Sequence, residues 1–425
     1  MPQGKKRTLE KNNHNGTKPK RLKVTHDSHG SVHGVVLACG QGDVGQLGLG
    51  VDITERTRLA YVEIPDPVIQ VCAGGMHTVC LTNTGQVFTF GCNDEGALGR
   101  DTSVEGSDAK PGKVNIPAPI VMVTAGDSHT AALTDDGRVY AWGNFRDANG
   151  SMGLTTNGIE KTPFELIQEE VIVKMVSGSD HLVCLTDRGD LLSLGCAEQG
   201  QLGRIAECFA TRGGRKGLDM ILSPGRVKVK RFKTRKMAQF CDVWAGAYTT
   251  FAKEKETGDI YAWGLNNYYQ LGFNDMVNRF IPERVTSFSE KGSWSMLSGG
   301  QHHTVALDSK GKVYTIGRED YGRLGLDKNC GEKQEPTLVP ALQDFTCVNV
   351  AAGGCVSFAV TNDGTLYSWG MGSNNQLGSG DDEDQFVPTK VAGKQLESRS
   401  AVMVSAGGQH TVVLAKSIEN GDTNH

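Results

Sequence analysis

The sequence predicts an all-β fold, a seven-bladed β-propeller built from seven repeats of about 51 residues. Three observations predict this fold. The chain is rich in glycine without the period of collagen, a two-part motif recurs seven times, and short apolar runs alternate with turn residues. At 425 residues the chain is longer than one hydrophobic core usually serves, which also favours a repeat array.

The composition is that of a folded protein, with glycine as the outlier. Glycine supplies 55 of 425 residues, about twice its ordinary share, while proline supplies 13, so the glycines belong to turns. No apolar run approaches the roughly 18 residues of a membrane helix, and the basic N-terminus lacks the apolar segment of a secretory signal. Several of the eleven cysteines (Cys39, Cys92, Cys184 and Cys196) lie in apolar runs. We expect buried, reduced thiols, no metal and no cofactor.

The first repeated element is an apolar strand that ends in glycine and continues into a polar loop ending in Leu-Gly. The strand-end glycines are Gly40, Gly91, Gly143, Gly195, Gly264, Gly317 and Gly370. Their spacings are 51, 52, 52, 69, 53 and 53 residues. A second element precedes the first in each unit, as in AGGMHTVCLTNTGQV (73–87) and SGGQHHTVALDSKGKV (298–313). Seven copies of both halves make seven units.

Each unit holds short apolar runs separated by Gly, Asp and Asn, which predicts the four strands of a propeller blade. The chain begins with a second half-unit and ends with a first half-unit. Pairing of the N- and C-terminal strands would therefore close the ring and leave no free edge. We predict a disordered basic tail at 1–33, the propeller at 34–417 with a basic insertion at 208–236, and a disordered tail at 418–425.

These motifs carry a family resemblance. The Gly-Gly-x-His-Thr and Trp-Gly-x-Asn-x-x-Gly-Gln-Leu-Gly patterns resemble the repeat of the regulator of chromosome condensation family, whose members exchange nucleotide on the small GTPase Ran. Non-repeated stretches are similar too, among them GCNDEGALGRDTSVEGS (91–107) and RGGRKGL (212–218). The resemblance covers nearly the whole chain and implies a nuclear, chromatin-associated exchange factor.

The loop of the third unit departs from the repeat. Six units place eight positions between the strand-end glycine and the Leu-Gly glycine, whereas the third places ten, from Gly143 to Gly153. We expect a protruding hairpin turned at 149–150. From the residues alone, a tolerated surface insertion is the alternative. The resemblance implies a wedge against the phosphate-binding region of the GTPase, with GTPase contacts by Phe145, Arg146, Asp147 and Asn149.

Acidic and histidine residues also break the pattern. Asp127 replaces the second glycine of its motif, Asp180 precedes the repeat histidine, and His302 is an extra histidine before His303. The resemblance assigns catalytic roles to Asp180 and His302. It assigns GTPase binding to a further set: Asp43, His77, Asp127, Arg204, Asn267 and His410. The residues alone favour a structural role for each repeat histidine. The family usually has histidine where this chain has Tyr269, which we therefore leave out.

The net charge of −4 conceals two basic segments. Residues 1–33 carry +6 and residues 212–236 carry +9, so the rest of the chain carries −19. The tail resembles a bipartite nuclear import signal, and both segments suit DNA phosphates. The resemblance adds docking of the insertion on the histone octamer. Our candidates for chromatin binding are Lys5, Lys6, Arg7, Lys18, Lys20, Arg21, Lys23, Arg212, Arg215 and Arg226.

The sequence shows no catalytic triad and no phosphate-binding loop of its own, so we expect binding rather than covalent chemistry. The expected partners are Ran, the histone octamer, nucleosomal DNA and a nuclear import receptor, with no membrane. The family role is production of Ran-GTP around chromosomes for nuclear transport, spindle assembly and nuclear envelope formation. The alternatives are a propeller scaffold or chromatin adaptor without exchange activity, and a propeller enzyme, which would need converging carboxylates or a metal site.

Overall fold

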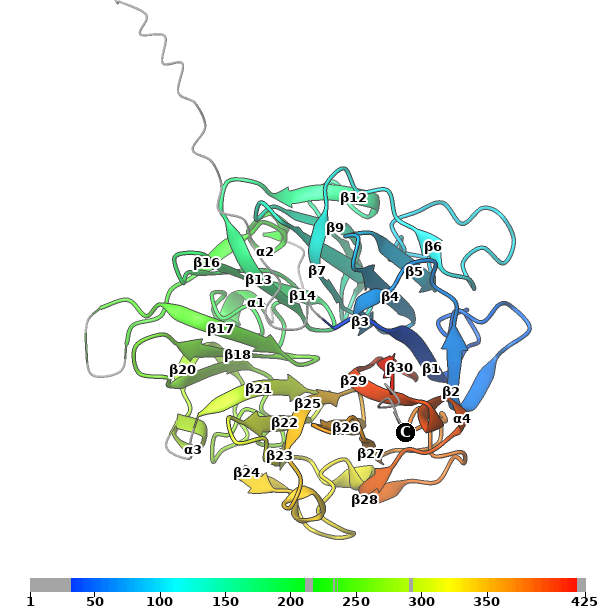
Figure 1. The fold of residues 1–425 in the computed structure, drawn as a ribbon. Coiled ribbons are helices and arrows are strands. Elements are labelled where there is room, and N and C mark those ends of the chain that lie inside the picture. The colour runs from blue at the N-terminus through cyan, green and yellow to red at the C-terminus, as the bar shows by residue number, and fades with distance from the viewer. Residues whose placement is uncertain (1–31, 211–216, 232–233, 235, 290–292, 419–425) are drawn as a thin grey trace, which may run out of the picture.

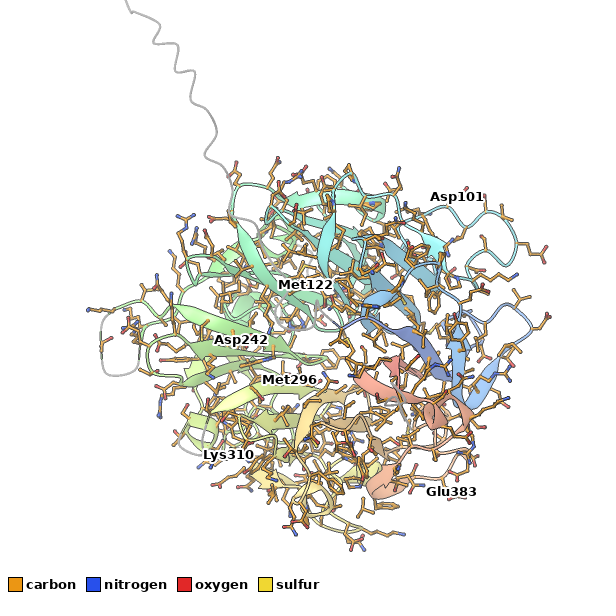
Figure 2. The ribbon with its side chains drawn as sticks, in the orientation of Figure 1. Asp101, Met122, Asp242, Met296, Lys310 and Glu383 are labelled. Carbon is orange, nitrogen blue, oxygen red and sulfur yellow. The ribbon has the colours of Figure 1, made fainter. Side chains whose placement is uncertain are left out.

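The computed structural model describes residues 32–210, 217–231, 234, 236–289 and 293–418. Seven four-stranded antiparallel sheets surround a common axis, which confirms the predicted seven-bladed propeller (Figure 1). Side chains on the innermost strands, such as Met122 and Met296, lie near the centre, whereas Asp101 and Glu383 lie at the rim (Figure 2). The predicted tails fall on residues 1–33 and 418–425, almost all of them outside the described residues.

The blades are numbered from the one that contains both chain ends, and their strands are given from the innermost outward. Blade 1 contains β29 (Arg399–Ala406), β30 (His410–Ser417), β1 (Val35–Gln41) and β2 (Glu55–Val62). Blade 2 contains β3 (Val68–Ala73), β4 (His77–Thr82), β5 (Val87–Gly91) and β6 (Gly112–Lys113). Blade 3 contains β7 (Ile120–Ala125), β8 (His129–Thr134), β9 (Val139–Gly143) and β12 (Glu160–Ile167). Blade 4 contains β13 (Ile172–Ser177), β14 (His181–Thr186), β15 (Leu191–Gly195) and β16 (Gly225–Val227).

The remaining three blades follow the same order. Blade 5 contains β17 (Phe240–Ala245), β18 (Thr249–Glu254), β19 (Ile260–Gly264) and β20 (Arg279–Arg284). Blade 6 contains β21 (Trp294–Gly299), β22 (His303–Asp308), β23 (Val313–Gly317) and β24 (Lys333–Leu338). Blade 7 contains β25 (Cys347–Ala352), β26 (Val356–Thr361), β27 (Leu366–Gly370) and β28 (Gln385–Lys390). The short helices are α1 (Glu207–Ala210), α2 (Leu218–Leu222), α3 (Thr286–Ser289), α4 (Lys394–Glu397), η1 (Asp320–Gly322) and η2 (Pro340–Leu342).

The core lies between blades rather than inside one. The two middle strands of a blade have neighbours on both faces, so strands such as β8 and β9 are buried at every position and read as apolar runs rather than as alternating ones. Seven apolar clusters each join two adjacent blades. No blade could bury its own faces alone, and the ring is therefore the folding unit.

The repeated glycines are required for two reasons: the backbone adopts a positive φ, and neighbouring atoms leave no room for a Cβ. Every strand-end glycine has a positive φ, from 96° at Gly143 to 114° at Gly91 and Gly317. A Cβ at Gly91 would stand 2.6 Å from the Met76 carbonyl oxygen. The Leu-Gly glycine answers a different need, because a Cβ at Gly99 would stand 2.7 Å from Nε1 of Trp142 in the next blade. That indole donates a hydrogen bond of 2.8 Å to the Ala97 carbonyl and so ties blade 3 to blade 2.

The two ends of the chain complete one blade, as predicted. Strand β1 pairs with β30 from Val35 opposite Ala415 to Gly40 opposite His410. Within the described residues no helix is long and apolar enough to cross a membrane.

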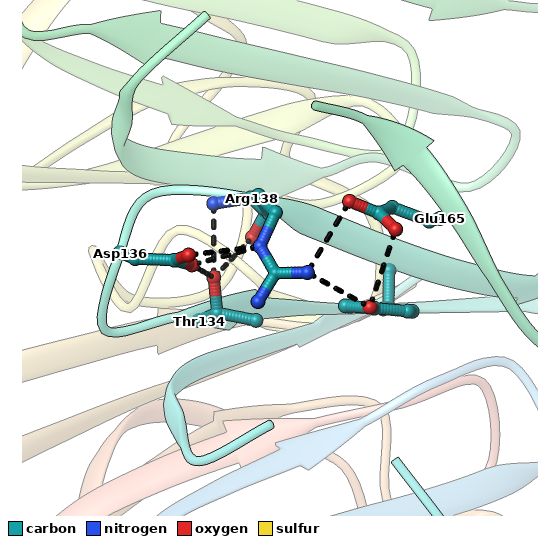
Figure 3. A network of polar contacts seen from close by, with 5 residues as sticks. Thr134, Asp136, Arg138 and Glu165 are labelled. Carbon is teal, nitrogen blue, oxygen red and sulfur yellow. Dashed lines mark hydrogen bonds and ion pairs between the residues drawn. The ribbon is translucent and has the colours of Figure 1, made fainter. Parts of the chain in front are cut away.

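At the end away from the strand-end glycine, the second and third strands of a blade are joined by a tight turn. In blade 3, Arg138 bonds the Asp136 carboxylate through Nε at 2.9 Å and approaches Glu165 at 3.4 Å (Figure 3). Thr134 donates to Asp136 at 2.5 Å and closes the same turn. This network lies at the end of the blade away from the strand-end glycine Gly143.

Candidate functional site

One face of the ring collects the residues that break the repeat. In each blade the first residue of the second strand pairs with the strand-end glycine, as His77 does with Gly91 and His303 with Gly317. The Gly-Gly loops and the loops after the strand-end glycines therefore share one face, which we call the loop face. A channel of about 760 Å³ opens there, and Asp127, Arg146 and Gln301 are among its lining residues.

The repeat histidines lie beneath this face and join neighbouring blades. His410 Nε2 lies 2.9 Å from the Thr78 hydroxyl, which donates in turn to the Gln46 carbonyl at 2.8 Å. Because the hydroxyl proton is used on the carbonyl, Nε2 must carry the hydrogen and donate. Burial lowers the pKa of His410 to about 3, so its ring is neutral at pH 7.

This geometry gives two of the predicted GTPase-binding histidines a structural role. His77 is 1% exposed and donates across the next junction to Thr130 at 2.9 Å, and His410 is fully buried. Both imidazoles are buried and bonded between blades, so this geometry gives no support to the predicted GTPase contacts of His77 and His410. The structural role that the repeat alone favoured is the one observed.

The long loop of blade 3 forms the predicted hairpin. Strands β10 (Phe145–Asp147) and β11 (Gly150–Gly153) pair in an antiparallel ladder in which Asp147 faces Gly150. The two turn residues are thus 148–149 rather than 149–150. Gly150 follows them with φ 107°, and a Cβ there would touch nothing within 4 Å. The glycine serves the turn conformation alone.

The hairpin presents fewer side chains than expected. Phe145 is fully buried at its base, where its ring lies 4.6 Å from that of His129. Phe145 therefore anchors the hairpin, and this geometry gives no support to its predicted GTPase contact. Arg146 and Asn149 are exposed and Asp147 is half-buried, so these three remain on the accessible part of the hairpin.

Carboxylates surround Arg146 at the rim of the channel. Asp180 Oδ1 accepts the Arg146 backbone N–H at 2.7 Å, and Glu95 forms an ion pair with the Arg146 guanidinium. Burial, followed by repulsion from Asp127, raises the pKa of Asp180 to about 7. A carboxyl with a pKa near neutral pH, in contact with the channel-lining Arg146, is characteristic of a functional position. Asp127 is itself exposed on the loop face.

A second group lies between blades 5 and 6, where the structure brings Asn267 and His302 together. His302 Nδ1 lies 3.2 Å from the Asn267 amide oxygen and donates to it. Tyr268 packs its edge against the His302 ring at 5.0 Å, and the Arg318 guanidinium lies over Tyr268 at 4.4 Å. Burial and two nearby arginines lower the pKa of His302 to about 4. A neutral His302 can donate or accept a hydrogen bond but cannot supply charge.

Arg204 and Asp43 stand apart from both groups. Arg204 donates to the carbonyls of Met220, at 2.8 Å, and Ser223, at 3.0 Å, and so fastens the insertion to blade 4. Arg100 makes the same kind of contact in blade 2, donating to the Lys110 carbonyl at 3.1 Å. The repeat therefore accounts for Arg204, and its predicted GTPase contact has no support in this geometry. Asp43 is exposed on the loop face of blade 1.

The insertion of blade 4 packs against the hairpin of blade 3. Leu222 of α2 packs in the same cluster as Phe145. A cavity of about 140 Å³ lies between hairpin and insertion and is lined by Asp147, Met152 and Phe209 among others.

Most of the predicted chromatin-binding residues lie outside the described residues. Arg226 on β16 is ion-paired with Glu170 and Asp190, so its charge is largely neutralised within blade 4. Arg212, Arg215 and the predicted tail residues Lys5, Lys6, Arg7, Lys18, Lys20, Arg21 and Lys23 lie outside the described residues.

The sequence of this ring is similar to that of known proteins. The sequence model of the RCC1-like domain matches residues 35–413, almost the whole ring. The chain belongs to the RCC1-like family. The human regulator of chromosome condensation is 54% identical over 405 residues and 95% of each chain. The guanine nucleotide exchange factor SRM1 of Saccharomyces cerevisiae is 29% identical over 92% of each chain.

Solved structures of an RCC1-like protein from the same yeast agree with this ring. The crystal structure of Prp20p, described with its binding properties to Gsp1p and histones, matches with a TM-score of 0.80 at 27% identity over 94% of each chain. The structure of yeast RCC1 (Prp20) bound by Kap60 matches with a TM-score of 0.81 at 27% identity, over 98% of this chain and 97% of that one.

Sequence reasoning missed two residues at the site of this RCC1-like ring. Glu95 and Glu198 both bond the hairpin. The sequence does contain a signal for these two glutamates. Among the six regular loops, only those of blades 2 and 4 have a glutamate three or four positions after the strand-end glycine, and these two blades flank the hairpin. The geometry of Tyr269 was also hidden, since it adopts φ 63° at a loop position where Gly45, Gly96 and Gly200 stand in other units.

Proposed function

We propose that this protein is a guanine-nucleotide exchange factor for the small GTPase Ran, held on chromatin. The observation that carries the proposal is the hairpin of blade 3, which rises on the loop face beside Asp180 and the channel rim. Two further facts support it: the 54% identity with the human regulator of chromosome condensation, and the yeast relative named as an exchange factor. The family role of supplying Ran-GTP around chromosomes for nuclear transport, spindle assembly and nuclear envelope formation belongs to the same proposal.

The mechanism is binding linkage. A factor that binds the nucleotide-free GTPase more tightly than the loaded form weakens nucleotide by the same free energy. A nucleotide held at about picomolar affinity is bound by roughly 16 kcal/mol, so the factor must supply several kcal/mol of differential contact. The hairpin would displace the phosphate-binding loop, and Asp180 would hold basic groups that the phosphates leave. Asp43, Asp127 and Asn267 would complete the surface around them, with His302 as a neutral hydrogen-bonding group.

The acidic propeller and the basic segments suit different partners. A loop face with Asp43, Asp127 and Asp180 complements a basic GTPase surface. The tail and the insertion would bind DNA phosphates and the histone octamer, with a salt-dependent affinity. Histone binding is described for yeast Prp20p, and a complex with Kap60 for the same yeast protein. An import receptor that binds the tail is thus part of the proposal.

Release of a fluorescent GDP analogue from Ran tests the exchange function. We expect catalytic amounts of the protein to accelerate release, and D180A and H302A to slow it. Unchanged release with the unaltered protein would refute exchange and leave the alternative of a propeller scaffold or chromatin adaptor. Normal rates in both variants would refute the site. Deletion of residues 1–33 should weaken nucleosome binding and leave exchange in solution intact.

A further inference from the structure

The hairpin of blade 3 is held from both sides by carboxylates of its neighbours. From blade 4, Glu198 Oε2 accepts the Ala148 backbone N–H at 3.1 Å, at the tip of the hairpin. From blade 2, Glu95 pairs with the Arg146 guanidinium and accepts Asn144 Nδ2 at 3.0 Å, at the base. The hairpin is therefore fixed at its tip and at its base by two different blades.

Asn144 connects Glu95 to the second strand of the hairpin, β11. Its amide oxygen accepts the Gly153 N–H at 2.7 Å and the Ser151 hydroxyl at 3.1 Å. Asn144 is fully buried, and the Glu95 side chain is 19% exposed. The contact with Glu95 fixes which way the Asn144 amide faces, because its NH2 group must point to the carboxylate and its oxygen to β11.

An isolated hairpin of this size needs such supports. Strands β10 and β11 contain three and four residues, and a lone two-stranded hairpin is at most marginally stable in water. Phe145 anchors the base, whereas Ala148 and Asn149 at the tip are exposed. Glu198 supplies a tip contact. Among the six regular loops, only those of blades 2 and 4, which flank the hairpin, have glutamate three or four positions after the strand-end glycine.

We propose that Glu95 and Glu198 are positioning residues, which hold the hairpin in the orientation that nucleotide exchange requires. This inference rests on the proposed function. Both side chains act through the hairpin: Glu95 through Asn144 and Arg146, and Glu198 through the Ala148 amide. Pre-organisation of this kind lowers the ordering cost when the hairpin meets its partner.

The first test measures the hairpin itself. In the full-length protein, amide hydrogen exchange at Arg146 and Ala148 should accelerate about tenfold in E95A and E198A. The variant E198Q keeps an acceptor oxygen and should restore protection. E165A, which removes a glutamate of blade 3 at the opposite face of the ring, is the matched control and should leave these amides unchanged. Unaltered protection in E95A and E198A would overturn the proposal.

The second test separates positioning from direct contact. We expect the maximal rate of GDP release from Ran to fall about tenfold in E95A and E198A, because misplacement of a reacting group by about 1 Å can cost up to 100-fold. The half-saturating concentration should stay within about twofold of the unaltered value, and E198Q should recover most of the rate. A raised half-saturating concentration with an unchanged maximal rate would mean that the glutamates bind the partner directly, and would overturn the positioning role.

These outcomes separate the two proposals. An unaltered protein that releases no nucleotide refutes the proposed function. Normal release by the unaltered protein, with unchanged maximal rates in E95A and E198A, refutes the positioning role alone.

Discussion

Asp180 offers a sharp test, because its carboxyl is held where ionisation is unfavourable. Its pKa is raised from the ordinary value of 3.8 to about 7, first by burial and then by Asp127. An acid whose pKa is higher in the folded chain than in the unfolded chain binds its proton more tightly when folded. Its ionisation therefore lowers stability as the pH rises from about 4 to about 7. The variant D180N cannot ionise, yet its amide oxygen can still accept the Arg146 N–H.

The expected gain follows from the pKa. At about 1.36 kcal/mol per unit, a shift of about three units corresponds to roughly 4 kcal/mol. Because the Asp180 side chain is partly solvated, we expect about half of that, so D180N should be more stable than the unaltered protein by about 2 kcal/mol at pH 8. At pH 5 Asp180 is already protonated in the folded chain, and the gain should fall below about 1 kcal/mol.

Denaturant unfolding at the two pH values measures this difference. D43N removes an exposed carboxylate of the same face and is the control, for which we expect no such pH-dependent gain. D180N should also release GDP from Ran more slowly, since a group kept at a cost to stability is expected to serve function. A variant less stable than the unaltered protein at pH 8, or an equal gain at both pH values, would refute the reasoning.

Three further predictions concern the histidine junctions, the hairpin turn and the second group. Replacing Thr78 by valine leaves Nε2 of the buried His410 without an acceptor, so stability should fall by about 1–3 kcal/mol in denaturant unfolding; an unchanged midpoint would contradict the junction. G150A places alanine at φ 107° with free space around it, and should lower stability by only about 1–2 kcal/mol while slowing GDP release; normal release would show that the turn conformation is not needed. R318Q should raise the pKa of His302 by less than about one unit in an NMR titration, since burial is the larger cause; a lowered pKa would contradict the assignment.

The fold could be predicted from the sequence because seven blades with the same packing need the same residues at the same positions, so the pattern recurs seven times. Glycine spacing predicted the blades, and the split unit at the ends predicted the pairing of β1 with β30. The site was predicted less completely. Sequence position does not reveal depth, so the resemblance assigned GTPase contacts to Phe145 and His410, whose side chains are fully buried. Contacts between blades depend on side-chain reach across about 50 residues of chain, and for that reason Glu95 and Glu198 were missed.

The pairing of the two chain ends also affects how the protein is made. Val35 finds its partner Ala415 only 380 residues later, so one strand of blade 1 waits for nearly the whole chain to leave the ribosome. Contacts of such sequence separation carry a large loop-closure entropy and fold late. Until then β1 presents an open edge, the kind of surface on which chains aggregate. A nascent ring should therefore depend on chaperone protection until its last strand is translated, and a truncation just before β30 should leave an incomplete ring rather than a shorter functional protein.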